Sequence, residues 1–309
     1  MRSFIKILLF TALIFVPTGV CAQDSGAGND PAVETSEPPS EVEADAAKAE
    51  ISEPPSEAEA DAAKADIKEE FKADKTGTNP INFQYDFRLY NEYQWLNTDG
   101  DGWQNTSTLE FRAPFANGKW QFRMRARGQV IQADLNGDGI DDLDDAGLGD
   151  TDIRFLTVPY MNLKRRIAIA PALEVFLDTA TDDALGSGSW VLGPQAFVAF
   201  FRPFGLPFDF FPGYQHKFSV GGNDVHQGLI DLFVLKTWRT KTRWLLLDPQ
   251  IVLDYENDAE FALIDVEVGA MLEEYIGLKG HSAYLRPSFG IGTDRPYDYS
   301  LELGYKIVW

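Results

Sequence analysis

Residues 81–95 read INFQYDFRLYNEYQW, and apolar and polar side chains alternate along most of this stretch. A period of two places successive side chains on opposite faces of an extended strand. The stretch therefore predicts a β-strand with one apolar and one polar face. The apolar face is rich in aromatic rings and carries Ile81, Phe83, Tyr85, Phe87, Leu89, Tyr93 and Trp95.

The same alternation continues toward the C-terminus. It recurs in residues 108–115 and 120–127, which flank Asn117-Gly118, a pair favoured in two-residue hairpin turns. It returns in residues 298–309, and the chain ends on the aromatic Trp309. Further strands are expected near 151–161, 166–178, 189–201, 207–220, 227–238, 243–255, 261–272 and 281–292.

These segments predict an all-β fold, a transmembrane antiparallel up-and-down β-barrel of about 12 strands. Short connections are expected to alternate with longer acidic ones, as in outer-membrane barrels. A soluble β-sandwich or lipocalin-like barrel has the same periodicity with its apolar face turned inward. Aromatic apolar faces, charges on nearly every polar face and the aromatic C-terminus favour the membrane barrel.

The first 76 residues differ from the barrel region. Residues 1–22 combine a basic start, a short apolar run and a small-residue site before Gln23, which predicts a signal peptide cut after Ala22. Acylation of Cys21 is the alternative, although Val20 is larger than a lipoprotein site prefers. Residues 23–76 hold a 16-residue acidic Pro/Ala/Glu repeat in two copies, and we expect a disordered acidic tether. The barrel domain is then 77–309.

Composition and motifs exclude other classes of protein. The formal charge of −21 disfavours a nucleic-acid partner, because phosphate binding requires clustered Lys and Arg. An outer-membrane phospholipase would need a histidine beside a serine. His216 and Ser219 are three residues apart, so on a strand they point to opposite faces. No enzymatic activity is therefore expected.

An acidic stretch between two strands fits a calcium loop. Short oxygen side chains alternate there around glycines that permit sharp turns, as in known calcium loops. Ca²⁺ is thus a candidate structural cofactor in loop 134–145, and a solvated acidic loop is the alternative. The predicted ligands are Asp134, Asn136, Asp138, the backbone carbonyl of Ile140, and Asp142.

The polar strand faces should line the lumen of a membrane barrel. Basic residues lie on the early strands and acidic ones on later strands, which predicts opposed walls of opposite charge. A lumen filled by ion pairs is the alternative to an open or gated pore. The predicted pore-lining residues are Arg88, Arg112, Arg123, Arg125, Arg127, Arg154, Asp231, Asp248, Asp265 and Glu267.

Two motifs carry a family resemblance. Gly147-Leu-Gly-Asp150 opens a predicted strand, and residues 176–194 read FLDTATDDALGSGSWVLGP. In both, the chain resembles the outer-membrane barrel family that includes the MetA-pathway phenol-degradation proteins, over most of residues 80–309. The resemblance implies a channel-like barrel for hydrophobic or aromatic compounds, with no catalytic residues.

The sequence therefore predicts a passive channel for small solutes in the cell outer membrane, with the tether in the periplasm. A structural or adhesive surface protein without transport is the alternative. The expected partners are the lipid bilayer with its lipopolysaccharide, the outer-membrane assembly machinery, and a small solute that the sequence does not identify.

Overall fold

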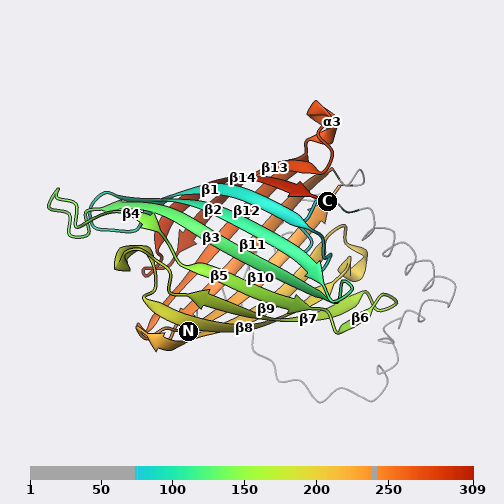
Figure 1. Ribbon diagram of the computed structural model, residues 1–309, viewed down its shortest axis with the longest axis horizontal. Coiled ribbons are helices and arrows are strands. Elements are labelled where there is room, and N and C mark those ends of the chain that lie inside the picture. The colour runs from blue at the N-terminus through green and yellow to red at the C-terminus, as the bar shows by residue number, and fades with distance from the viewer. Residues whose placement is uncertain (1–73, 75, 239–241) are drawn as a thin grey trace, which may run out of the picture. The chain divides into compact units, whose positions relative to one another are not determined.

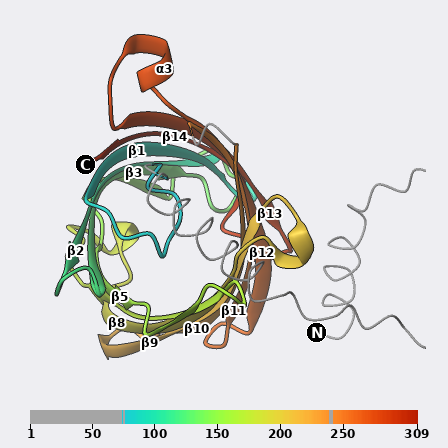
Figure 2. The same ribbon diagram turned by 90° about the vertical axis from the view of Figure 1, so that its right-hand side faces the viewer.

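The computed structural model describes residues 74, 76–238 and 242–309. The predicted signal peptide and nearly all of the predicted acidic tether lie outside these residues. The described chain is almost entirely β-structure and closes into an antiparallel barrel, seen from the side in Figure 1 and down its bore in Figure 2. Among the described residues, no helix is long and apolar enough to cross a bilayer.

Fourteen strands make up the barrel wall. They are β1 (Asp86–Leu96), β2 (Gly102–Phe115), β3 (Trp120–Ala133), β4 (Leu143–Leu148), β5 (Thr151–Thr157), β6 (Tyr160–Asn162), β7 (Ile167–Leu177), β8 (Ser189–Phe200), β9 (Asp209–Gly222), β10 (His226–Thr237), β11 (Arg243–Asp254), β12 (Ala259–Met271), β13 (His281–Ile291) and β14 (Tyr297–Val308).

These fourteen segments form the twelve spanning strands of the barrel, as predicted, and we call each spanning strand a stave. β4 and β5 both pair with β3, while β5 and β6 both pair with β7, so β4, β5 and β6 are successive pieces of one stave. Every other strand pairs with its neighbours in chain order. The barrel closes where β1 pairs with β14, from Asp86 opposite Val308 to Leu96 opposite Tyr297. Closure removes both free sheet edges, which a bilayer does not tolerate.

Exposure decides which face points outward. On β1 Leu89 is 48% exposed, whereas the preceding residue, Arg88, is only 6% exposed. Across the closing seam, Leu303 is 63% exposed and Lys306 is 1% exposed. The apolar face therefore covers the outside of the barrel and the charged face lines the inside. A soluble barrel has the reverse arrangement, so the fold is that of a membrane barrel.

Aromatic rings gather near both rims of the outer surface. At the rim where β1 ends, the ring centroids of Trp95 and Tyr299 lie 4.7 Å apart. At the opposite rim, Phe115 lies 6.3 Å from both Trp120 and Phe155. Two such girdles mark the membrane–water interfaces of outer-membrane barrels. We call the rim where β1 begins and β14 ends the terminal rim, and the opposite one the loop rim.

Two local predictions need correction. The connection at Asn117-Gly118 is not a two-residue turn, because the last strand pair is Phe115 with Trp120. Ala116, Asn117 and Gly118 all adopt positive φ, and Gly118 N–H donates to the Phe115 carbonyl at 3.1 Å. This hairpin therefore closes over four residues.

The connection lengths also fail to alternate strictly. At the terminal rim, residues 201–208 and 272–280 are as long as several loops of the other rim. Both contain a short helical turn, Pro203–Gly205 (η2) in the first and Glu273–Ile276 (α3) in the second. Another turn, Asp183–Leu185 (η1), lies at the loop rim.

Candidate functional site in the barrel lumen

The chain just before β1 lies inside the barrel. We call residues 76–84 the lumen segment; part of it was predicted to begin the first strand, but β1 starts only at Asp86. Figure 2 shows this cyan segment within the bore. Arg88 Nη2 donates to the Gly77 carbonyl at 2.6 Å, and Lys306 Nζ donates to Thr78 Oγ1 at 3.3 Å.

Apolar packing anchors the lumen segment near the terminal rim. Ile81 is 5% exposed and belongs to a cluster of inward-facing apolar residues that includes Phe201, Trp244 and Met271. These partners lie next to the terminal-rim ends of β8, β11 and β12. The segment therefore narrows the bore at the rim that carries both chain ends of the barrel.

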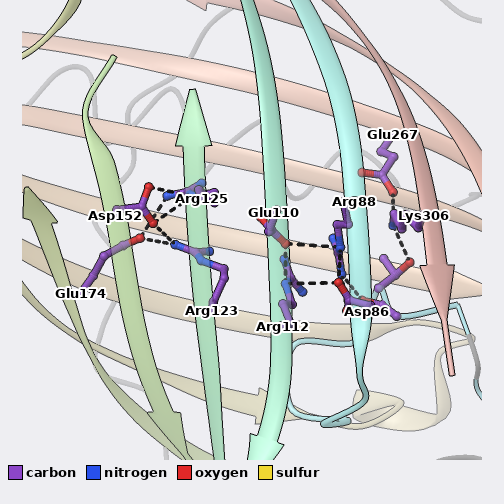
Figure 3. A network of polar contacts seen from close by, with 12 residues as sticks. Asp86, Arg88, Glu110, Arg112, Arg123, Arg125, Asp152, Glu174, Glu267 and Lys306 are labelled. Carbon is purple, nitrogen blue, oxygen red and sulfur yellow. Dashed lines mark hydrogen bonds and ion pairs between the residues drawn. The ribbon is translucent and has the colours of Figure 1, made fainter. Parts of the chain in front are cut away.

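A network of ion pairs covers the inward face of β1 and β2 (Figure 3). Arg88 Nε lies 2.9 Å from Asp86 Oδ1 and 3.3 Å from Glu110 Oε1. Arg112 Nε lies 2.5 Å from Glu110 Oε1. Each acid is two residues from an arginine on its own strand and opposite one on the neighbouring strand, so every charge here has a partner.

A second network joins β3, β5 and β7. Arg125 Nε lies 2.9 Å from Asp152 Oδ2, and its Nη2 lies 3.0 Å from Glu174 Oε1. Arg123 contacts both acids, and Arg127 Nη2 lies 2.5 Å from Asp152 Oδ2. Asp152 is fully buried and Glu174 is 4% exposed. The arginine ladder of β3 is therefore held by acids of the adjacent strands.

This pairing corrects the prediction that basic and acidic residues line separate, opposed walls. Acids and arginines share the inward face of the early staves because they share sequence parity. The pairs Asp86/Arg88 and Glu110/Arg112 are each two residues apart and form ion pairs, so this spacing was a usable sequence signal for salt-bridged strands.

A third network surrounds Glu267 on β12. Its side chain is 1% exposed and contacts the guanidinium of Arg286, while its Oε1 lies 3.3 Å from Lys306 Nζ. Trp244 Nε1 donates to the same oxygen at 2.5 Å. Lys306 also lies over the rings of Trp244 and Tyr284, at 4.6 Å and 4.7 Å from their centroids. Neither Lys306 nor Arg286 was among the predicted pore-lining residues.

Three carboxylates on β10, β11 and β12 form an acidic row, consisting of Asp231, Asp248 and Asp265. Asp248 lies directly opposite Asp265, and Asp231 lies opposite Gln250. Among the described residues, none of the three carboxylates forms an ion pair with a lysine, arginine or histidine. Gln250 Nε2 donates to Asp248 at 3.1 Å, and Ser288 Oγ donates to Asp265 at 2.5 Å.

Arg154 on β5 is an inward-facing cation that, like the carboxylates of the acidic row, lacks an ion-pair partner among the described residues. It stands opposite Arg123 on one side and Glu174 on the other. Arg154 is only 9% exposed. Among the described residues it forms no ion pair, and its Nε has no hydrogen-bond acceptor. The Glu174 oxygens are taken by Arg123, Arg125 and Gln215.

These groups surround a cavity of about 420 Å³ inside the barrel. Nine of the ten predicted pore-lining residues line it, whereas Asp265 lies next to it on β12 without lining it. Thr78 and Pro80 of the lumen segment line it as well. Apolar side chains complete the wall, and those on β7 to β11 are Phe176, Phe197, Phe211, Leu229, Phe233 and Leu246.

The predicted calcium ligands lie in a tight loop outside the loop rim. Asp134 Oδ1 accepts from Gly137 N–H at 2.7 Å, and its Oδ2 accepts from Gly139 N–H at 2.8 Å. Partial desolvation raises the pKa of Asp134, but these hydrogen bonds outweigh it and hold the pKa below its ordinary value. Among the described residues, no three His, Cys, Asp or Glu side chains are spaced to hold a metal.

Calcium binding at this loop stays a prediction, which chelation tests. If Ca²⁺ bridges the loop, EGTA should speed protease cleavage within residues 134–142, because the acidic side chains then repel one another. The double variant Asp138→Ala, Asp142→Ala should be cleaved as fast as the EGTA-treated parent protein, with or without chelator. Cleavage of the unaltered protein that ignores chelator would show that the loop is only a solvated acidic turn.

Comparison with known proteins supports the fold of the chain but does not assign it to a sequence family. No protein-family model and no curated protein matches the sequence. Among solved structures, the COG4313 outer membrane channel from Pseudomonas putida F1 is 10% identical, with a TM-score of 0.59 over 74% of this chain and 96% of that one. A NanC porin structure is 9% identical, with a TM-score of 0.48 over 72% and 98%. The first likeness supports the outer-membrane β-barrel fold.

Proposed function

We propose that the protein is a passive outer-membrane channel for small solutes. One observation carries the proposal. An apolar, aromatic outer surface encloses a polar cavity of about 420 Å³ in the bore, which is the arrangement of a barrel that spans a bilayer around an aqueous path. The COG4313 protein, whose fold this chain shares, is described as an outer membrane channel.

The cavity favours solutes with an apolar or aromatic body. Phe197, Phe211 and Phe233 stand beside charged groups in its lining, so a ring can pack there while polar atoms face the charges. The resemblance to the family with the phenol-degradation proteins supports the same class of solute. We propose no catalytic role for the barrel. His216 lies on the outer face, with its ring centroid 5.0 Å from that of His226 and 6.2 Å from that of Tyr255.

Current through a planar bilayer tests the proposal. The purified full chain, shown to be folded by heat-modifiable migration on a gel, should give discrete conductance steps. The same preparation should swell liposomes in isotonic small solutes. A folded protein that passes neither ions nor solute would leave the barrel as an ion-paired structural element and overturn the channel.

We further propose that the terminal rim faces the periplasm, which places the tether there and loop 134–142 at the cell surface. An even number of staves puts both ends of the barrel on one side. Ile140 is 68% exposed in the outer loop, and Lys119 is exposed in the β2–β3 turn at the opposite rim.

Cysteine labelling tests this orientation. Ile140→Cys should react with a membrane-impermeant maleimide on intact cells, and Lys119→Cys should react only after the cells are broken. The parent chain without an introduced cysteine gives the background. The reverse labelling pattern would invert the topology.

The C-terminus suggests how the barrel reaches the membrane. Trp309 N–H donates to the Tyr85 carbonyl at 3.1 Å, but its ring is 64% exposed beside that of Tyr85, at 6.2 Å between centroids. An exposed terminal aromatic side chain on the closing stave is free for recognition by the assembly machinery, which we propose as a partner.

A further inference from the structure

We propose that the lumen holds a binding site for a zwitterion with an apolar body, such as an aromatic amino acid. The proposal rests on the channel proposed above and names the class of solute that its cavity selects. It starts from the few charged groups that the ion-pair networks leave without partners.

The unpartnered donors lie on one side of the cavity. Arg154 has no ion pair among the described residues, and the Nε atoms of Arg154 and Arg123 are buried without a protein acceptor. Arg123 and Arg154 face each other across β3 and β5, so these donors belong to one region of the wall. Burying a guanidinium without a full set of acceptors is costly, and a ligand carboxylate that accepts from it removes the cost.

The unpartnered acceptors lie on the other side. Asp231 Oδ1 and Asp248 Oδ1 are shielded from solvent and find no N–H or O–H donor among the described residues, and the two carboxyl groups lie within hydrogen-bond range of each other. They lie on the adjacent strands β10 and β11, and Asp248 also faces Asp265 directly. Like charges placed opposite each other in a sheet repel. An ammonium group offers three N–H donors and a positive charge, so it relieves both the missing hydrogen bonds and the repulsion.

The two sides share one cavity. Arg154, Asp231 and Asp248 all line it, and Asp231 lies within electrostatic range of Arg154 although no ion pair forms between them. The apolar side chains of Phe197, Phe211 and Phe233 line the same space. A molecule with a carboxylate, an ammonium and a ring therefore meets a matching group for each part.

A rival explanation is that Arg154 and the acidic row only balance each other across a water-filled bore. A purely anionic solute would use Arg154 and leave the acids unrelieved, and a purely cationic one would do the reverse. These explanations differ in how binding depends on each ligand charge, so a matched ligand series separates them.

The experiment is calorimetric titration of the full chain in detergent micelles at neutral pH. The probes are phenylalanine, 3-phenylpropanoate, which lacks the ammonium, and phenethylamine, which lacks the carboxylate. Phenylalanine should bind about ten- to a hundredfold more tightly than either analogue, because each charge adds charge-assisted hydrogen bonds. Titration into empty micelles corrects for partitioning.

Two substitutions assign the charges. Arg154→Gln should weaken phenylalanine to the affinity of phenethylamine and leave phenethylamine unchanged. Asp248→Asn should weaken phenylalanine and phenethylamine and leave 3-phenylpropanoate unchanged. Arg295→Gln removes the same charge at the loop rim, where Arg295 pairs with Asp298 at 2.6 Å, and should leave the ligand order intact. Heat-modifiable migration shows that each variant is folded.

The proposal fails if either single-charge analogue binds as tightly as phenylalanine, or if none of the three binds. Conductance of the same preparation keeps this failure apart from failure of the channel. Current without preference for phenylalanine overturns the zwitterion site alone. Binding of phenylalanine without current or solute flux overturns the channel and leaves the site.

Discussion

Replacing Glu267 with Gln should lower the free energy of unfolding by about 3–5 kcal/mol, the usual cost of removing one partner from a buried ion pair. The amide keeps the size of the side chain but leaves Lys306, which is 1% exposed, without its anion. Arg286 loses its closest carboxylate and keeps only Glu302, at 3.8 Å. Equilibrium unfolding in urea, with the barrel in detergent micelles, measures the loss.

A second substitution separates the buried charge from the shape of the site. Adding Lys306→Met to Glu267→Gln removes the orphaned cation, and it should recover much of the lost stability. The partly exposed pair of Arg295 and Asp298 is the control. Asp298→Asn there should cost about 0–1 kcal/mol, because solvent screens the pair. A Glu267→Gln variant as stable as the parent would show that the network does not stabilise the barrel.

Deleting residues 23–84, and so the whole lumen segment, should raise single-channel conductance at least about twofold, because backbone that narrows the bore is removed. Arg88 and Lys306 lose their contacts with Gly77 and Thr78, but both keep carboxylate partners in the wall. The barrel should therefore still fold and migrate in a heat-modifiable way.

A shorter deletion provides the control. Removing residues 23–70 takes away the repeats and keeps the lumen segment, so conductance should stay at the parent value. Equal conductance in all three proteins would mean that the lumen segment does not limit the path. An increase in the shorter deletion would assign the restriction to the repeats instead.

Strand periodicity made most of the barrel predictable. Every predicted segment overlaps a stave, because a strand with one face in lipid and one in a polar lumen must alternate at every residue, although β4 (Leu143–Leu148) was not predicted. The prediction was weakest where a segment leaves the wall. Residues 81–85 continue the alternation of β1, but Ile81 packs inside the bore instead.

The inward-facing positions could also be predicted from the sequence, since nine of the ten predicted lining residues surround the cavity. Which of these charged side chains form ion pairs with one another could be predicted only in part. Arg88 and Asp86 are two residues apart, so one strand brings them together. Arg123 and Glu174 are 51 residues apart and meet only through the register of β3, β5 and β7.

The sequence by itself determined that the chain is all-β, where the staves run, and which side chains share a face, because these depend on a period that each strand carries alone. The tertiary structure decided that the apolar face points outward and that residues before β1 enter the bore. It also decided that, within the described part of the chain, Arg154 has no ion pair while Arg123 has two. Each of these depends on closure and strand register, which bring together residues distant in sequence and leave some charges without partners.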